Sequence, residues 1–493
     1  MNKEEYLRLI DGVNRTGKYK ADWQSLSGHK IPDRYYESKF GIFIHWGIYS
    51  VPAFMNEWYP RAMYDPVNPA YEFHKKTFGD QKDFGYKDFI PMFKGENFNA
   101  EEWADLFLKS GAGFVMPVCE HHDGFAMYDT DFNRWNAAKM GPCRDVAMEL
   151  KKACEDRGLM FCASSHRAEH YFFMNMGRAC AGDVTDEEYR DFYGPAYLCP
   201  ELAGDDVFPT IADAYSPVQP DEEWLCDWLV RTCELIDRLK PSVLYFDSWI
   251  HNAAFKPYLK KMCAYYYNRA DEWGKEVTID YKHQSFPPTV ATYDVERGAL
   301  TGIYPVPWQT DTAIGRKSWG FTRDNEFKPA RQIICDLIDI VSKNGMLLLN
   351  VGPKPDGTVT EEETSVLEQI GRWLNVNGEG IYGTVPWVKF GEGEVNNVEG
   401  AFQDNDEKGF TSQDFRFTYK NGSLYAFCMR PDSDRFVIRS LNIKGSYDIV
   451  TGPVEVLGER SVVNSYRDGD GLNILLDKIP DSDRPVCFKI GIE

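Results

Sequence analysis

The sequence predicts an α/β protein, in which a decorated (β/α) TIM-like barrel is followed by a small C-terminal antiparallel β-sandwich. Short apolar strands alternate with amphipathic helices over roughly 345 residues, as is typical of such barrels. From about residue 384 the pattern changes to short alternating strands separated by turn signals such as Asn421-Gly422. A doubly wound open sheet normally has a Gly-rich phosphate turn after its first strand, and none is visible. We therefore expect a barrel domain of residues 1–383 and a sandwich of residues 384–493.

The clearest unit of the barrel is the stretch 242–249, SVLYFDSW. A run of apolar and aromatic residues stops at the carboxylate of Asp247, and helical patterns lie on either side of it, at residues 222–239 and 253–270. Helix, buried strand, strand-end carboxylate and helix in this order make one unit of a βα-barrel. Further strands are expected within residues 39–50 and at 114–118, 159–163, 276–280, 292–297, 305–310 and 345–351, and further helices at 100–110, 144–156, 328–343 and 361–375.

Two parts of the barrel domain do not follow this alternation. Residues 1–38 form a polar lead-in with two helix-like pieces. Residues 171–220 are rich in Gly, Pro, Asp and Tyr, and we expect an irregular loop there. A loop of that length in a compact domain is usually functional. Its tyrosines at positions 189, 193 and 197 are expected to shape the side of the site that receives the remainder of a substrate.

Composition limits the possible partners and the compartment. The formal net charge of −21 disfavours nucleic acid or an anionic membrane surface, since both would be repelled. The 12 cysteines include no CxxC pair and mostly fall in apolar patterns, which predicts free thiols in a reducing compartment. The N-terminus lacks an apolar leader segment, and no apolar run approaches the roughly 20 residues of a membrane span. We expect a cytoplasmic protein, with secretion after removal of a leader as the alternative.

Polar side chains recur where the expected strands end, which is where such barrels carry their chemistry. These strand-end residues are His45, His121, His122, His166, Asp247 and Lys282.

Three functions are compatible with this set. A metal-dependent hydrolase would use the histidines and Asp247 as ligands. However, His121 and His122 are adjacent, and neighbours on a strand end point in opposite directions, so that they rarely share an ion. We therefore expect no metal and no other cofactor. A catalytically silent carbohydrate-binding barrel would need neither nucleophile nor acid, and it stays an alternative.

The third function is glycoside hydrolysis, which needs two carboxyl groups facing one cleft. One stays ionised and attacks the anomeric carbon, while the other is held protonated and releases the leaving group. Asp247 fits the first role because it ends a strand among aromatic, His and Lys neighbours. The residues alone leave the second carboxyl open, with Glu57, Glu120, Glu169, Asp294 and Glu296 as candidates.

Several multi-residue motifs follow one another from about residue 30 to about residue 385. They are KFGIFIHWGIYS at residues 39–50, NEWY at 56–59, HHDGF at 121–125, YFD at 245–247, NGMLLLNVGP at 344–353, WL at 373–374 and NGEGIY at 377–382. In these motifs the chain resembles glycoside hydrolase family 29, the α-L-fucosidases. So many motifs at suitable separations are very unlikely by chance, and the expected C-terminal sandwich suits the architecture of that family.

The resemblance implies a retaining exo-hydrolase that removes terminal α-L-fucose from fucosylated oligosaccharides or glycoconjugates by double displacement. It places Asp247 on the nucleophile and, by counting on from the fifth strand, Glu296 on the general acid/base. The implied sugar-binding residues are His45, Glu57, Trp58, His121, His122, His166, Tyr245 and Lys282.

The chain departs from the family at three positions. Tyr245 stands where relatives often have Trp, Lys282 where some have Arg, and Glu120 where Lys is frequent. A lysine supplies a point charge where an arginine supplies a planar fork. None of these changes removes a carboxylate that the mechanism requires. Linkage preference and oligomeric state are not predicted.

Overall fold

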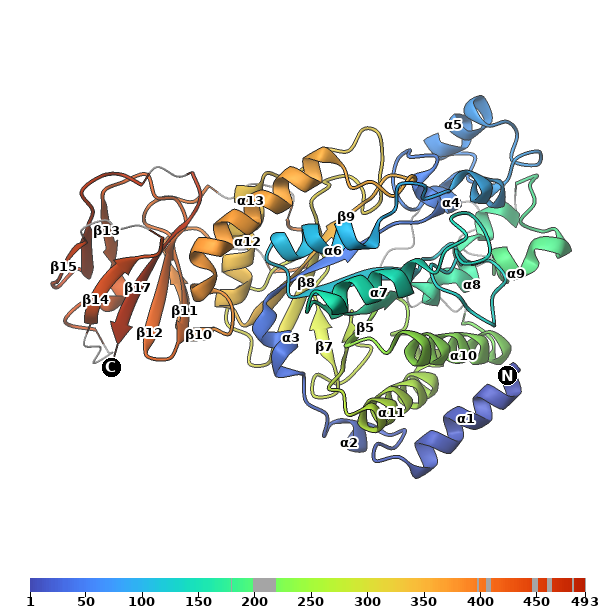
Figure 1. Cartoon of the computed structure of the whole chain (residues 1–493), viewed down its shortest axis with the longest axis horizontal. Helices are drawn as coiled ribbons and strands as arrows, with labels where there is room; N and C mark the ends of the chain where they lie inside the picture. Colours follow the sequence, from blue (N-terminus) through green and yellow to red (C-terminus); the bar gives the residue numbers. More distant parts are fainter. Residues whose placement is uncertain are drawn as a thin grey trace.

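A computed structural model describes residues 1–178, 180–197, 219–396, 399–404, 409–445, 451–458, 463–480 and 483–492. Figure 1 shows a large α/β domain with a smaller all-β domain beside it, and the C-terminus lies in the smaller domain.

The large domain is built on a closed parallel barrel. Because β1 pairs with both β9 and β2, the sheet has no free edge, and the predicted barrel is confirmed. Its third position is made of two pieces, β3 and β4, which Cys162 separates. The barrel strands are β1 (Phe40–Ile44), β2 (Phe114–Glu120), β3 (Met160–Phe161), β4 (Ala163–Ser165), β5 (Val243–Phe246), β6 (Thr278–Tyr281), β7 (Thr292–Asp294), β8 (Trp308–Ala313) and β9 (Gly345–Val351).

Amphipathic helices cover the outside of the barrel, and polar residues cap the first turns of α6, α7, α10 and α13. Asn99 accepts from the backbone N–H groups of the first turn of α6, and Asp221 accepts from that of Trp224 at the start of α10. Within the described ranges, no helix has the length and apolar character needed to cross a bilayer. The covering helices are α6 (Ala100–Lys109), α7 (Val146–Asp156), α10 (Glu222–Leu239), α11 (Lys256–Trp273), α12 (Ala330–Ser342) and α13 (Glu361–Asn377).

The N-terminal lead-in is more helical than predicted. It forms α1 (Lys3–Thr16), α2 (Trp23–Leu26) and α3 (Asp33–Ser38). α1 lies against α10 and α11, where the Tyr6 hydroxyl donates to Asp237 at 2.6 Å. The lead-in is thus fixed to the outer layer of helices (Figure 1).

Short helices fill the connections after β1 and β4. The described part of the stretch predicted to be irregular, residues 171–178 and 180–197, consists of helices of three or four residues joined by turns and bends; residues 198–218 lie outside the described ranges. Tyr193 is completely buried, and its hydroxyl donates to Asp183 at 2.6 Å, so it cannot line a substrate cleft. The helices are η1 (Ile48–Ser50), α4 (Tyr59–Ala62), α5 (Pro69–Thr77), η2 (Tyr86–Met92), η3 (Arg167–Glu169), α8 (His170–Phe173), η4 (Asn175–Arg178), η5 (Glu187–Tyr189), α9 (Arg190–Tyr193) and, after β5, η7 (Ala253–Phe255).

The smaller domain consists of two antiparallel sheets that enclose a second hydrophobic core, which confirms the sandwich. Aromatic side chains such as Phe415, Phe417 and Phe488 fill that core. One sheet has the order β10 (Val385–Glu392), β11 (Phe415–Lys420), β12 (Ser423–Cys428), β17 (Val486–Ile492) and β14 (Thr451–Val456); the other has β13 (Arg435–Ile438), β16 (Leu472–Leu475) and β15 (Asn464–Arg467), with η8 (Gly378–Gly380) and η9 (Arg439–Leu441) outside the sheets.

The two domains share a buried interface along α12 and α13 (Figure 1). Arg416 on β11 donates to Asp339 on α12 at 2.6 Å, and both side chains are about fully enclosed. Trp373 on α13 donates its indole N–H to the backbone carbonyl of Pro485 at 2.7 Å. An ion pair removed from water needs a fixed geometry to offset its desolvation. The interface therefore sets one orientation of the sandwich on the barrel.

Candidate active site

The side chains predicted for the site gather at one rim of the barrel. In a parallel barrel the carboxyl ends of all strands meet at the same end. Asp247 directly follows the four buried residues of β5, and its side chain is 14% exposed. The others follow their strands in the same way: His45 after β1, His121 and His122 after β2, His166 after β4, Lys282 after β6, and Glu296 two residues beyond β7.

Lys282 joins the two predicted catalytic carboxyl groups. Its Nζ donates to Asp247 Oδ1 at 2.9 Å and to Glu296 Oε2 at 2.7 Å. Asp311, buried on β8, places its Oδ2 3.4 Å from the same nitrogen. Burial alone would lower the pKa of Lys282, but these negative charges raise it well above its usual value. The sequence predicts a sugar contact for Lys282, whereas the structure shows its ammonium bound by carboxylates.

Two imidazoles approach the other oxygen of Asp247. His166 Nδ1 lies 3.3 Å from Asp247 Oδ2, and His122 Nε2 lies 3.5 Å from it. Burial alone would raise the pKa of Asp247, but the charge of Lys282 and the neighbouring His166 hold it well below its usual range. Asp247 is therefore ionised at neutral pH, which is the state a carboxylate nucleophile needs.

The pKa of Glu296 is shifted in the opposite direction. Burial raises its pKa to about 7 against the opposing charge of Lys282, and the charge of Asp247 adds to the increase. Two carboxyl groups whose environments drive their pKa values apart are the pattern of a glycosidase acid and nucleophile.

The spacing of these two carboxyl groups follows from their shared lysine. Lys282 Nζ lies 2.9 Å from one carboxylate oxygen and 2.7 Å from the other, so the distance between these two oxygens cannot exceed the sum of the two lengths. That limit applies to the two bonded oxygens, and it is compatible with the carboxyl spacing of about 5–5.5 Å in retaining glycosidases.

Glu57 and Trp58 lie on the wall of the same site. Glu57 Oε2 accepts from the Ser318 hydroxyl at 3.0 Å and from the backbone N–H of Trp319 at 2.9 Å. The half-buried Trp58 ring packs edge-on against His122, with ring centres 5.5 Å apart. Because Glu57 is ordered by two donors, we assign it a binding role in place of the second carboxyl.

Two other candidates for the second carboxyl are bound to groups outside the site. Glu120 Oε1 accepts from Arg167 at 2.8 Å and from Arg231 at 2.7 Å, so it is a structural ion pair. Asp294 is buried inside the barrel and accepts from the Gln309 amide at 2.9 Å. Neither is placed to protonate a leaving group.

Glu169 is the remaining rival to Glu296. It is buried, and its Oε2 has no hydrogen-bond partner but lies 3.6 Å from His122 Nδ1. Burial, with the charges of Asp247 and Glu296, raises the pKa of Glu169 well above its usual value. A protonated carboxyl is thus also present behind His122, and the experiment that separates the two is given in the Discussion.

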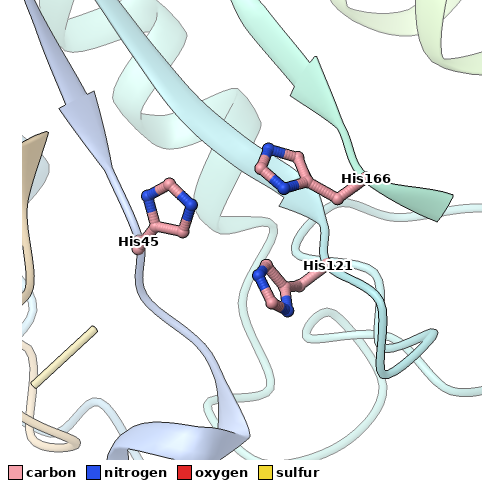
Figure 2. Close-up of side chains that lie close together, drawn as sticks. All are labelled: His45, His121 and His166. Atoms are coloured by element: carbon pink, nitrogen blue, oxygen red, sulfur yellow. The ribbon is translucent and has the colours of Figure 1, made fainter. Parts of the chain in front are cut away.

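Three imidazoles face one another beside the carboxylates. Figure 2 shows His45, His121 and His166 grouped just past the ends of their strands, with the His166 ring centre 5.3 Å from that of His45 and 5.2 Å from that of His121. A hydrogen bond of 2.6 Å joins His45 Nδ1 to Asn350 Oδ1. Burial lowers the pKa of His45 and of His121 well below the usual value, so both rings are neutral. A neutral imidazole has one donor and one acceptor nitrogen, which suits sugar hydroxyls.

The same rings have the composition of a metal site. His45, His121 and His166 form one possible ligand set, and His122, His166 and Asp247 form another, each with its ligand atoms within 4.8 Å of one another. His121 and His122 fall in different sets, but their ring centres lie only 4.2 Å apart, so the prediction that these neighbours point in opposite directions is wrong. The ammonium of Lys282 adjoins Asp247, and its positive charge repels a divalent ion. This arrangement favours a sugar over a metal as the occupant.

Chelation tests this assignment. We expect prolonged EDTA treatment followed by desalting to leave the rate of aryl α-L-fucoside hydrolysis unchanged, because the reacting groups identified above are side chains. A mock-treated sample is the control. A loss of activity that Zn²⁺ restores would establish a metal-dependent hydrolase in place of the carboxylate mechanism.

Tyr245 does not line the site as predicted. Its side chain has no exposed surface, so it cannot stack on a sugar. Its hydroxyl donates to Asp311 Oδ2 at 2.9 Å, and its ring packs against Phe43. Side chains two residues apart on a strand point to the same side, so Tyr245 faces the inside of the barrel as Asp247 does. Tyr245 lies deeper, in the barrel core, which explains the error.

Several functional neighbours were not found from the sequence. Asn350 lies within a quoted motif, yet only the structure pairs it with His45. Asp311 lies on β8, just past the strand predicted at residues 305–310, and its contact with Lys282 depends on the closed barrel. Ser318 and Trp319 fall in a segment without periodicity, so no sequence signal places them beside Glu57.

The family can now be assigned. A protein-family model described as Alpha-L-fucosidase matches residues 9–379, most of the chain. The chain belongs to the α-L-fucosidase family. It is therefore a glycoside hydrolase by family, which agrees with the paired carboxyl groups described above.

Similar members of this α-L-fucosidase family come from animals and bacteria. The tissue α-L-fucosidase of Bos taurus is 30% identical, over 75% of this chain and 73% of its own length. The tissue α-L-fucosidase of Homo sapiens is 28% identical, over 98% of this chain and 94% of its own length. The crystal structure of Thermotoga maritima α-fucosidase in complex with a mechanism-based inhibitor has a TM-score of 0.74 at 28% identity, covering 96% of this chain and 100% of that chain. A second structure of that enzyme, in complex with fucose, has a TM-score of 0.73 at 28% identity, covering 96% and 99%.

Proposed function

We propose that this protein is a retaining exo-α-L-fucosidase that releases terminal α-L-fucose from fucosylated glycans by double displacement. The observation that carries the proposal is the single ammonium of Lys282 bonded to both Asp247 and Glu296. This bridge joins a carboxylate whose pKa is lowered to a carboxyl group whose pKa is raised, and such a pair supports a retaining mechanism. The family match supports fucose as the sugar that is released.

In the first step, Asp247 attacks the anomeric carbon of the fucose while Glu296 gives its proton to the glycosidic oxygen. The bond to the leaving group breaks, and the aglycone departs with that proton. A covalent fucosyl-enzyme remains on the Asp247 oxygen. His122 and His166, at 3.5 and 3.3 Å from Asp247 Oδ2, orient the carboxylate for this attack.

In the second step, water attacks the same carbon from the face the aglycone has left. Glu296, now ionised, takes a proton from that water. The bond to Asp247 breaks, fucose leaves with its original anomeric configuration, and both carboxyl groups return to their starting states.

The fucose would be held by the neutral histidines and the wall around Glu57. His45 donates from Nδ1 to Asn350 and so offers Nε2 as an acceptor, His121 offers one donor and one acceptor nitrogen, and Glu57 is a fixed acceptor. Trp58 provides a partly exposed aromatic face, which suits the apolar side of a 6-deoxy sugar. The Thermotoga maritima relative of the same fold has been solved in complex with fucose.

The experiment that tests the proposal is ¹H NMR of fucose release, first from an aryl α-L-fucoside and then from oligosaccharides with α1,2, α1,3/4 and α1,6 linkages. We expect α-L-fucose as the first product, before mutarotation. β-L-fucose as the first product would overturn the retaining mechanism. Fucose binding without release from any substrate would instead establish a carbohydrate-binding barrel.

Lys282→Met is expected to shift the pH profile of kcat/KM toward alkaline pH. Its positive charge lowers the pKa of both Asp247 and Glu296, so removing it raises both. With the native lysine, activity should fall as pH rises through about 7, where Glu296 loses its proton. In the variant, the acidic and alkaline limbs should both move up by roughly 1–3 pH units. Lys317→Met, at an exposed surface ion pair, is the matched control, and unshifted limbs in Lys282→Met would contradict the assignment.

We also propose that the protein works in a reducing compartment such as the cytoplasm. All cysteines that the structure describes are free, and most are buried, including Cys119, Cys233 and Cys263. Buried free thiols are typical of proteins that fold without disulfides.

A further inference from the structure

The backbone around Glu296 is held on both sides. On one side β8 extends its pairing beyond β7, where the N–H groups of Val295 and Arg297 donate to the carbonyls of Gln309 and Asp311 at 2.9 and 2.7 Å. On the other side lies a segment from beyond the barrel, residues 399–404, which follows β10 in the chain. The backbone at Glu296 thus lies between β8 on one side and residues 399–404 on the other. This second segment belongs to the C-terminal part of the protein.

Four backbone hydrogen bonds join residues 399–404 to the stretch that carries Glu296. Phe402 donates its backbone N–H to the Glu296 carbonyl at 3.1 Å, and Gln403 donates to the Arg297 carbonyl at 2.9 Å. Ala299 and Gly400 exchange both of their backbone hydrogen bonds, at 3.3 and 3.2 Å. The residue that carries the proposed acid/base is therefore fixed by its own carbonyl.

Asp404 fixes this segment to the barrel. Its carboxylate accepts from Lys328 at 2.5 Å, from Arg297 at 3.3 Å and from the Thr312 hydroxyl, and its side chain is only 10% exposed. Its backbone carbonyl accepts from the Gln332 amide at 2.8 Å. Burial alone would raise the pKa of Asp404, but the cations of Lys328 and Arg297 hold it below its usual value. A charged, multiply bonded carboxylate in this position is costly to disturb.

The partners of Asp404 lead to both halves of the site. Arg297 directly follows Glu296, and its guanidinium lies over the Trp319 ring at 5.3 Å. Trp319 in turn donates its backbone N–H to Glu57. Thr312 lies one residue beyond Asp311, the buried partner of Lys282. These contacts connect Asp404 more directly to Glu296, the proposed acid/base, than to Asp247, the proposed nucleophile, which follows β5. A displacement of Asp404 would therefore disturb Glu296 first.

We propose that residues 399–404 are a positioning element for the general acid/base and that Asp404 is its anchoring residue. The proposal rests on the assignment of Glu296 as that acid/base. Asp404 acts through backbone and charge contacts, and its role is to hold the Glu296 carboxyl at the distance from which it can protonate the leaving oxygen. Misplacement of a reacting group by about 1 Å can cost about 100-fold in rate.

The test compares Asp404→Asn with Glu399→Gln. Both variants lose one negative charge from the same segment, but Glu399 accepts from the exposed Thr301 hydroxyl at 3.0 Å and contacts none of the groups that fix Asp404. For Asp404→Asn we expect kcat/KM to fall at least about 10-fold on an aryl fucoside with a poor leaving group and less than about 2-fold on one with an activated leaving group. Glu399→Gln should match the native enzyme on both.

Thr312→Val gives a milder variant in case Asp404→Asn fails to fold. It removes one donor to Asp404 and one acceptor for Lys328, at 2.8 Å, without changing a charge or the side-chain shape. We expect the same selective loss on poor leaving groups, smaller in size. Equal losses on both substrate classes, or no loss in either variant, would overturn the positioning role.

A double-mutant cycle separates this proposal from the assignment on which it rests. In a Glu296→Ala background, Asp404→Asn should cost no further activity, because the group it positions is absent. A further loss equal to that in the native background would show that Asp404 acts elsewhere. If Glu296→Ala alone shows no dependence on the leaving group, the acid/base assignment itself has failed.

Discussion

Asp247→Asn should lower the turnover of an aryl α-L-fucoside by at least about 10³-fold, because the variant lacks the nucleophile of the first step. The substitution keeps the shape of the side chain and its place at the end of β5. It removes the negative charge that faces Lys282, His122 and His166. The loss should therefore appear in kcat, measured by release of the aryl group, while fucose binding measured by calorimetry persists.

The control for this variant tests whether the fold is intact. Thermal unfolding followed by circular dichroism should give a transition as cooperative as that of the native enzyme. Asp324→Asn, which removes a carboxylate that is 71% exposed, should leave turnover unchanged. Near-native turnover in Asp247→Asn would remove Asp247 from the mechanism, whatever the family resemblance.

Glu296→Ala should reduce hydrolysis of substrates with poor leaving groups by roughly 10²–10⁴-fold, the usual contribution of a general acid. Activated aryl fucosides need little proton donation, so their first step should be nearly unaffected. Their second step lacks a base, and added azide should restore part of the rate by attacking the fucosyl-enzyme without one. The measurement is a series of aryl fucosides with leaving groups of increasing pKa, assayed with and without azide.

Glu169→Gln is the matched comparison, because Glu169 is the other carboxyl near Asp247 whose pKa is strongly raised. If Glu169→Gln shows the leaving-group dependence and azide rescue while Glu296→Ala does not, the acid is Glu169. The bond of Glu296 to Lys282 and its larger exposure favour Glu296, since its 21% exposed side chain can reach a departing sugar and Glu169 is enclosed.

The place of Asp247 at the end of a strand and most of the barrel were predictable because they depend on local signals. Apolar runs that stop at a polar residue mark strand ends, and the closed parallel sheet brings those ends together. The strand-end set from His45 to Lys282 is accordingly found at one rim. The second carboxyl was not decidable from the residues alone, because Glu296 follows a strand of three residues and its partner Lys282 comes from another strand.

The wrong or missing predictions concern residues whose position depends on their depth in the barrel or on contacts with residues distant in the sequence. The sequence places Tyr245 near Asp247 but does not say that its ring lies below the rim, bonded to Asp311. Tyr193 lies in a stretch whose composition is typical of a loop, but packing against elements distant in the sequence buries its side chain. Asp404 belongs to no recognised motif, and its contacts with Thr312 and Lys328 join residues that are 92 and 76 positions apart in the chain.

The lysine shared by both carboxyl groups has a consequence for the order of events in a turnover. Once fucose is esterified to Asp247, that oxygen no longer carries a charge, and Lys282 is left with Glu296 and Asp311 as its anionic neighbours. The repulsion from Asp247 that favoured a proton on Glu296 disappears at the same moment. The pKa of Glu296 should therefore fall while the ester exists, which favours the ionised form that accepts a proton from the attacking water. Release of fucose restores the charge of Asp247 and with it the preference of Glu296 for its proton.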